Sequence, residues 1–135
     1  MAKKFPTWVL ALLVILIGSV NGLAEYKHLY FYIWWLDIPM HLFGGLWVGL
    51  SILTYVFSYR QEWVKSDTLR TAFLLAVSGT FFVGIGWELF EFYVDRVDGL
   101  IRFDLIDTIS DVCNGMIGAG VGTALFFWRG YNRMT

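Results

Sequence analysis

The chain has 135 residues, of which 58% are hydrophobic, 19% aromatic and 16% charged, and its formal net charge is −1. Soluble domains are about a quarter charged, so this composition excludes an ordinary soluble enzyme and indicates an integral membrane protein. The balanced charge gives no electrostatic attraction to nucleic acid, and the single cysteine, Cys113, excludes an intrachain disulfide. We expect one membrane domain over residues 1–135, with the lipid bilayer as its partner.

The first apolar run covers residues 5–24 and contains no charged residue. Its twenty residues are long enough to cross ~30 Å of hydrocarbon at 1.5 Å per residue. Lys3 and Lys4 precede it, as in a signal peptide, but the run is long and its exit at 20–24 is a weak cleavage site. We therefore interpret it as a retained membrane helix.

An aromatic-rich connection follows at residues 25–35, a composition typical of the lipid headgroup level, where we expect a short interfacial helix. Three further spans are predicted at about 37–59, 71–94 and 104–128. Gly45 with Gly49, and Gly118 with Gly122, are pairs four residues apart that allow another helix to approach closely. The sequence thus predicts an all-α integral membrane protein, a bundle of four transmembrane helices.

Four spans place both termini on one side of the membrane, and the basic residues indicate which side. One side carries seven of them, namely Lys3, Lys4, Arg60, Lys65, Arg70, Arg129 and Arg133. The other carries three, namely Lys27, Arg96 and Arg102. Because cytoplasmic loops are enriched in Lys and Arg, we expect a multi-pass inner-membrane protein with both termini cytoplasmic.

Polar residues gather where three of the spans reach the outer side. They are Asp37 and His41 in the second span, Glu88 and Glu91 in the third, and Asp107, Asp111 and Asn114 in the fourth. Within each set the spacing is three or four residues, which places the side chains on one face of a helix. A charge at membrane depth costs at least ~2.5–3.5 kcal/mol, so we expect the three sets to meet in a shared outer-leaflet site.

Some of these residues also fit simpler roles. Asp37 and Asp107 are placed where they could cap their helices, and Asn114 could form an interhelical hydrogen bond. Cys113 is better explained as a small packing residue than as a nucleophile. His41, Glu88 and Asp111 are the hardest to explain by such roles, because they lie farthest inside their predicted membrane helices.

One histidine among carboxylates forms a hard, oxygen-rich donor set that suits Mg²⁺, Mn²⁺, Ca²⁺ or Zn²⁺. The expected cofactor is therefore a divalent metal ion, and its predicted ligands are His41, Glu88, Asp107 and Asp111. Glu88 and Glu91 are the predicted catalytic bases, acting on a metal-bound water, while Asp37 and Asn114 complete the polar site. Without a metal, clustered carboxylates must share protons, which suits a proton-linked or cation-binding role.

Taken in order, these motifs resemble the VanZ-like family and related small bacterial inner-membrane proteins. The resemblance covers residues 36–128 and rests on Asp37 and His41, on Trp87, Glu88 and Glu91, and on Asp107, Asp111, Asn114 and Gly118. It implies a bacterial cell-envelope protein, with some family members linked to glycopeptide tolerance. Ile38-Pro39 stands where relatives often carry Lys-Val or Lys-Ile, so a cation partner for Asp37 is missing, which favours a bound cation.

Three functions remain open at this point. The first is a metal-dependent enzyme acting on a lipid or lipid-linked substrate. The second is a non-enzymatic module that binds or transports a cation, a proton or another ligand. The third is an assembly subunit of a membrane complex, whose polar groups only hold helices together. A homodimer is also compatible with four helices.

Overall fold

The computed structural model describes residues 4–99 and 104–132, and these residues form helices and no strand. In chain order the elements are α1 (Thr7–Tyr26), α2 (Leu29–Tyr32), η1 (Trp34–Leu36), α3 (Asp37–Tyr59), η2 (Gln61–Trp63), α4 (Leu69–Val97) and α5 (Leu105–Trp128). Lys3, Arg102 and Arg133, which contribute to the predicted orientation, lie outside the described residues.

The prediction of an all-helical bundle with four long apolar helices is confirmed. α1, the segment Trp34–Tyr59, α4 and α5 are each long and apolar enough to cross a membrane. The aromatic connection forms two short helices, α2 and η1, between the first two spans. The molecule is therefore a multi-pass membrane protein whose connections are short.

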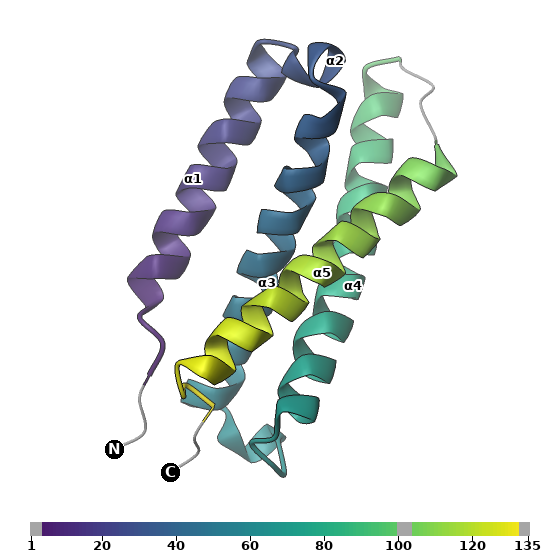
Figure 1. Ribbon diagram of the computed structural model, residues 1–135. Coiled ribbons are helices and arrows are strands. Elements are labelled where there is room, and N and C mark those ends of the chain that lie inside the picture. The colour runs from purple at the N-terminus through teal and green to yellow at the C-terminus, as the bar shows by residue number, and fades with distance from the viewer. Residues whose placement is uncertain (1–3, 100–103, 133–135) are drawn as a thin grey trace.

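α3 is the central helix, because it packs against α1, α4 and α5, and α4 and α5 also pack against each other. Figure 1 shows α5 crossing obliquely over α3 and α4, while α1 runs along the other side of α3. Ala24 is the only buried residue of α1. The Trp47 Nε1–H on α3 donates to the carbonyl oxygen of Leu10 at 2.9 Å and so ties the two helices together.

The closest approach in the bundle lies between α3 and α5, where the predicted glycine pairs fall. A β-carbon added at Gly45 would stand 1.9 Å from the carbonyl oxygen of Gly115, and one at Gly49 would stand 2.9 Å from Ala119. Only residues without larger side chains allow backbones this close. The expected role of the small residues in helix approach is confirmed.

The hydrophobic core lies toward one end of the bundle. Phe126 is fully buried there, and the rings of Phe5, Phe57 and Tyr131 lie within 6.0 Å of it, centroid to centroid. Asn132, the last described residue, donates to the carbonyl oxygen of Asp67 at 3.0 Å. We call this the terminal end, since the chain begins and ends there in the described part, and the opposite end, which carries α2, the distal end (Figure 1).

Charges are divided between the two ends. The terminal end carries five of the seven described basic residues, namely Lys4, Arg60, Lys65, Arg70 and Arg129, while Lys27 and Arg96 lie at the distal end. The distal end carries nine of the eleven acidic residues, namely Glu25, Asp37, Glu88, Glu91, Asp95, Asp98, Asp104, Asp107 and Asp111. The apolar core and the acidic groups therefore occupy opposite halves of the bundle.

Candidate functional site

The site begins in the first two turns of α3, where Asp37 and His41 lie four residues apart. This spacing places both side chains on one face of the helix, and His41 Nε2 lies 3.4 Å from Asp37 Oδ1. α3 follows η1 directly and has Leu36 at its N-cap position, with no side-chain cap. The interpretation of Asp37 as a helix cap is therefore wrong. The 3-10 helix η1 continues directly into α3, so Asp37 is the first residue of the helix, and its carboxylate lies near His41.

α5 brings a second carboxylate to the same imidazole. Asp111 is 5% exposed, and its Oδ2 lies 3.9 Å from His41 Nε2. One turn after each of these residues, Gly115 meets Gly45 across the α3–α5 interface. The close backbone approach thus fixes Asp111 against His41.

Asp104, and not Asp107, caps α5. Its carboxylate accepts hydrogen bonds from the backbone amides of Ile106, at 2.9 Å, and Asp107, at 3.4 Å. A carboxylate just outside a helix satisfies amides that have no partner within the helix, so the cap settles where α5 begins. The interpretation of Asp107 as a cap is corrected accordingly.

α4 supplies Glu88 and Glu91 from near its C-terminal end. One ligand atom each from His41, Glu88 and Glu91 lie within 4.8 Å of one another, and the same holds for Asp37, His41 and Asp111. Glu88 Oε1 is buried and has no hydrogen-bond partner, whereas the Glu91 residue is exposed. A buried carboxylate oxygen without a partner is costly and calls for a ligand or a proton.

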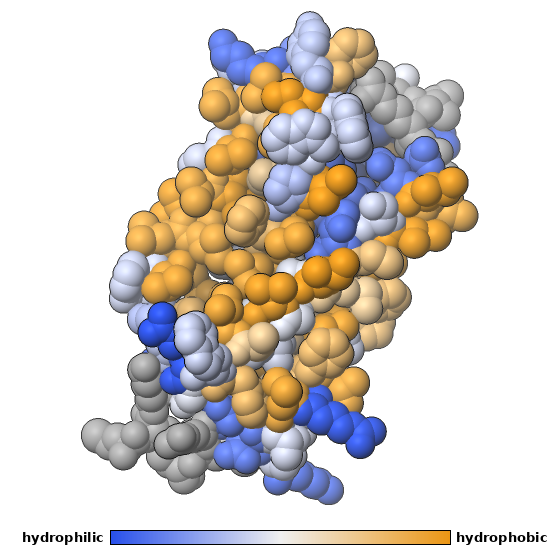
Figure 2. Space-filling model, in the orientation of Figure 1, coloured by the Kyte–Doolittle hydropathy of each residue, from blue (hydrophilic) through white to orange (hydrophobic). Residues whose placement is uncertain are grey.

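Five of the predicted site residues are thus brought together, and His41 belongs to both groups. We call Asp37, His41, Glu88, Glu91 and Asp111 the polar cluster. Figure 2 shows hydrophilic residues gathered between the distal part of α3 and the N-terminal half of α5, on a face that is otherwise largely hydrophobic. Part of the cluster is reachable, because the side chain of Asp37 is 33% exposed.

Two predicted residues lie outside these groups. Asp107 is exposed, one turn before Asp111, and belongs to neither group. Asn114 Nδ2 donates to Ser110 Oγ of its own helix at 3.4 Å, so its observed bond is not an interhelical one. Their roles in the site stay predictions.

The polar cluster is strongly acidic, and few positively charged groups lie near its carboxylates. Among residues 4–99 and 104–132, the one group that lies within 4.0 Å of these carboxylates and can carry a positive charge is His41. Like charges held together repel each other unless a proton or a cation intervenes. The arrangement therefore favours occupancy by a cation.

Tyr30 of α2 is a neighbour of the site that the sequence did not single out. Its hydroxyl donates to Asn21 Oδ1 on α1. Burial raises the pKa of Tyr30 to about 12, and the carboxylates of Asp37, Glu25 and Glu91 add to this shift. It is one of six aromatic residues between 26 and 35, and nothing in its spacing separates it from the others.

The donor set fits a divalent metal ion. One imidazole nitrogen and carboxylate oxygens are ligands of Zn²⁺, and oxygen-rich sets suit Mg²⁺, Mn²⁺ and Ca²⁺. Bonds of about 2.0–2.1 Å to one ion place neighbouring ligand atoms about 3–3.5 Å apart. The 3.4 Å and 3.9 Å separations at His41 are close to that spacing.

Comparison with known proteins places the chain among membrane proteins. The model of one protein family, described as "Predicted membrane protein (DUF2238)", matches residues 3–132. Comparison with curated proteins finds no match, and neither does comparison with solved structures. The family match spans all four long helices and every residue of the polar cluster.

Proposed function

We propose a function for this chain from the premise that it belongs to the DUF2238 family of predicted membrane proteins. In our proposal the polar cluster binds a divalent metal ion and uses it on a lipid or lipid-linked substrate of the bacterial envelope. The observation that carries the proposal is the convergence of His41 with carboxylates from three helices, in two groups whose ligand atoms each lie within 4.8 Å of one another.

The state of Glu88 supports a bound cation. Its Oε1 is buried without a hydrogen-bond partner in a site where further carboxylates repel it. Coordination to a metal would satisfy this oxygen and neutralise the repulsion in one step, whereas neither effect follows from helix packing alone. A purely structural role leaves this oxygen unexplained.

The proposed chemistry is hydrolysis. Glu88 or Glu91 would accept the proton of a water that a metal ion held by the cluster would activate. Glu91 is the more exposed of the two and so is better placed to reach a substrate. Asp37 and Asp111 would share the ion with His41, because an oxygen of each lies near its Nε2, at 3.4 Å and 3.9 Å.

The depth of the cluster is the reason for a lipid substrate. His41 lies four residues into α3 and Asp111 six residues into α5, which is about 6–9 Å from each helix start at 1.5 Å per residue. This depth corresponds to the boundary between headgroups and hydrocarbon, where phosphate and sugar groups of lipids are found. Substrates dissolved in the bilayer can reach the cluster from the side.

The cellular setting belongs to the same proposal. The division of basic and acidic residues between the ends supports an inner-membrane protein with cytoplasmic termini and an outward-facing cluster. The relationship to VanZ-like proteins is also proposed, on the order of the three motifs. Reporter domains fused to the C-terminus test the orientation: a reporter active only in the cytoplasm should be active, and one active only outside should be silent.

Elemental analysis of detergent-purified protein tests the metal site. We expect a divalent metal in the wild type and its loss from His41→Ala and Asp111→Asn. Asp95→Asn is the matched control, because Asp95 is an acidic residue of α4 one turn beyond Glu91 and belongs to neither ligand group. A wild type without metal at neutral pH overturns the proposal, as does equal metal content in all variants.

Turnover separates an enzyme from a binding module. Metal-loaded protein is incubated with a lipid extract of bacterial envelopes, and the products are followed by mass spectrometry. Conversion that is lost in Glu88→Gln supports the enzyme. Bound metal without any conversion would instead favour the non-enzymatic cation-binding module.

A further inference from the structure

Thr80 of α4 is a buried polar residue for which the proposed chemistry has no use. It is 4% exposed, and its hydroxyl oxygen is buried without a hydrogen-bond partner within the described part of the chain. Thr80 stands eleven residues after Leu69, the first residue of α4, which is about 17 Å along the helix and therefore in the hydrocarbon region. A hydroxyl without a hydrogen bond is costly at that depth, so its state calls for an explanation.

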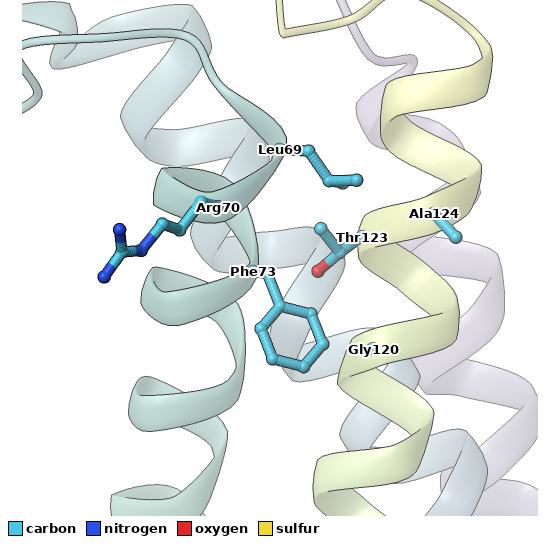
Figure 3. Close-up of a pocket in the computed structure, with 6 residues that line it drawn as sticks. All are labelled: Leu69, Arg70, Phe73, Gly120, Thr123 and Ala124. Atoms are coloured by element: carbon cyan, nitrogen blue, oxygen red, sulfur yellow. The ribbon is translucent and has the colours of Figure 1, made fainter.

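Thr123 of α5 shows what a buried hydroxyl does when no polar acceptor lies beside it. Figure 3 shows it beside Phe73 of α4, in a groove whose other lining side chains offer no hydrogen-bond acceptor. Its Oγ1 donates instead to the carbonyl oxygen of Ala119, four residues earlier on its own helix, at 2.9 Å. Thr80 has the same option, because the carbonyl oxygen of Ala76 lies four residues before it, but it makes no such bond. The Thr80 hydroxyl is therefore available to a group outside α4.

Thr80 lies at the inner side of the polar cluster, where α3, α4 and α5 meet. A β-carbon added at Gly115 of α5 would stand 3.7 Å from Thr80 Cγ2 and 3.8 Å from the carbonyl oxygen of His41. Gly115 follows Asp111 by one turn in the direction of the terminal end, so Thr80 lies about one turn deeper in the membrane than the contact between Asp111 and His41. Thr80 thus borders the buried side of the cluster and not its exposed side.

The packing at Gly115 leaves room beside Thr80. A β-carbon at Gly118 would stand 1.9 Å from a carbonyl oxygen of α3, whereas no atom of a neighbouring helix lies closer than 3.7 Å to a β-carbon at Gly115. The carbonyl oxygen of His41 borders this space and can accept a second hydrogen bond, and the carboxylate of Asp111 lies one turn farther along α5 toward the distal end. A buried water forms two to four hydrogen bonds to polar groups of this kind.

We infer that Thr80 is a positioning residue of the polar cluster, which holds a buried water between its hydroxyl, the carbonyl oxygen of His41 and the carboxylate of Asp111. Asp111 is 5% exposed, and its contact with His41, at 3.9 Å, is longer than a hydrogen bond, so it gains from a second partner. The water fixes this carboxylate in the orientation that ion binding requires. The inference rests on the proposed metal site, because Thr80 acts through a ligand of that site.

The metal affinity of Thr80→Val tests the inference, because valine keeps the shape of the side chain and removes its hydroxyl. Competition with a chromophoric chelator in detergent should show an affinity about tenfold lower than that of the wild type, as is typical when a group that orients a metal ligand is lost. Thr80→Ser, which keeps the hydroxyl, should retain most of the affinity. Unchanged affinity in Thr80→Val overturns the inference, and so does a loss in Thr80→Ser as large as that in Thr80→Val.

Thr54→Val is the matched control for the loss of a buried hydroxyl. Thr54 is 3% exposed, and its hydroxyl is also buried without a partner in the part of the chain that the structure describes. It lies on α3, thirteen residues after His41 toward the terminal end, so Thr54→Val should bind metal as the wild type does. Equal losses of affinity in Thr54→Val and Thr80→Val would contradict a specific role for Thr80.

Thermal unfolding in excess chelator gives a second readout, which needs no metal. A hydroxyl that holds a water contributes hydrogen bonds, so Thr80→Val should unfold at the same temperature as the wild type or at a lower one. A hydroxyl without any partner destabilises the fold, so a higher unfolding temperature in Thr80→Val would overturn the inference. A wild type without metal contradicts the metal site and leaves this readout valid, whereas bound metal with equal affinity in Thr80→Val contradicts the role of Thr80 alone.

Discussion

Gly45 of α3 lies against the backbone of Gly115 of α5, so closely that a β-carbon at Gly45 would stand 1.9 Å from the Gly115 carbonyl oxygen. Each glycine follows a residue of the polar cluster by one turn, since Gly45 follows His41 and Gly115 follows Asp111. The packing of two backbones therefore sets the distance between an imidazole and a buried carboxylate.

Gly45→Ala should destabilise the protein and disturb the polar cluster, because a backbone atom must move to admit the new methyl group. Overpacking of this kind costs about 1–3 kcal/mol of unfolding free energy. Gly44→Ala is the matched control, since a β-carbon at Gly44 meets nothing within 4 Å. Unfolding in detergent is the measurement, and equal stability of the two variants would contradict the close contact.

Glu88→Gln should be more stable to heat than the wild type without metal, and should lose the stabilisation that added metal gives the wild type. In the presence of a chelator the variant should unfold at a higher temperature, by about 3–6 °C for ~1 kcal/mol, because one buried charge is removed from an acidic site. With added metal the wild type should gain stability and the variant should gain little. Thermal unfolding under both conditions is the measurement, with Asp95→Asn as the control.

The result for Glu88 also discriminates among the three functions considered. A residue that only holds helices together should lower stability when changed, whether metal is present or not. A loss of stability in Glu88→Gln that is the same with and without metal would therefore contradict the proposed metal site and support the role of an assembly subunit.

Trp47→Phe should loosen α1 without disturbing the other three long helices. It removes the hydrogen bond from Nε1 to Leu10, worth about 0.5–1.5 kcal/mol, while keeping most of the aromatic packing. Hydrogen exchange should then speed up in α1 and stay unchanged in α5. Trp8→Phe, at a residue 64% exposed, is the control and should leave exchange in α1 as it was.

Tyr30 provides a pH-dependent prediction. Burial favours its neutral form, so the stability that this shift contributes is complete below pH 10 and is lost as the pH rises to about 12. The phenolate absorbance difference between the wild type and Tyr30→Phe should have its midpoint near pH 12. A midpoint near pH 10 would show that Tyr30 is fully solvated.

The convergence of three stretches could be predicted from the sequence because helix spacing and depth both restrict where charged residues can point. Asp37, His41, Glu88 and Glu91 follow from the cost of facing lipid. The difference between Asp107 and Asp111 could not be predicted, although both lie on one helix face. It depends on how α5 crosses α3 (Figure 1), because Asp107 lies one turn farther than Asp111 from the contact of Gly115 and Gly118 with α3. Tyr30 was missed for a related reason, since its position depends on how the connection folds back.

The order in which the helices are synthesised gives the α3–α5 contact a further meaning. α3 and α4 leave the ribosome first, so His41 and Glu88 enter the membrane before the carboxylate of Asp111 exists. The glycine face against which α3 packs is also on α5. A nascent chain that ends before α5 therefore holds His41 and Glu88 without the carboxylate of Asp111 and without the small residues of α5 that pack against α3. The polar cluster is therefore complete only once α5 has joined α3 and α4.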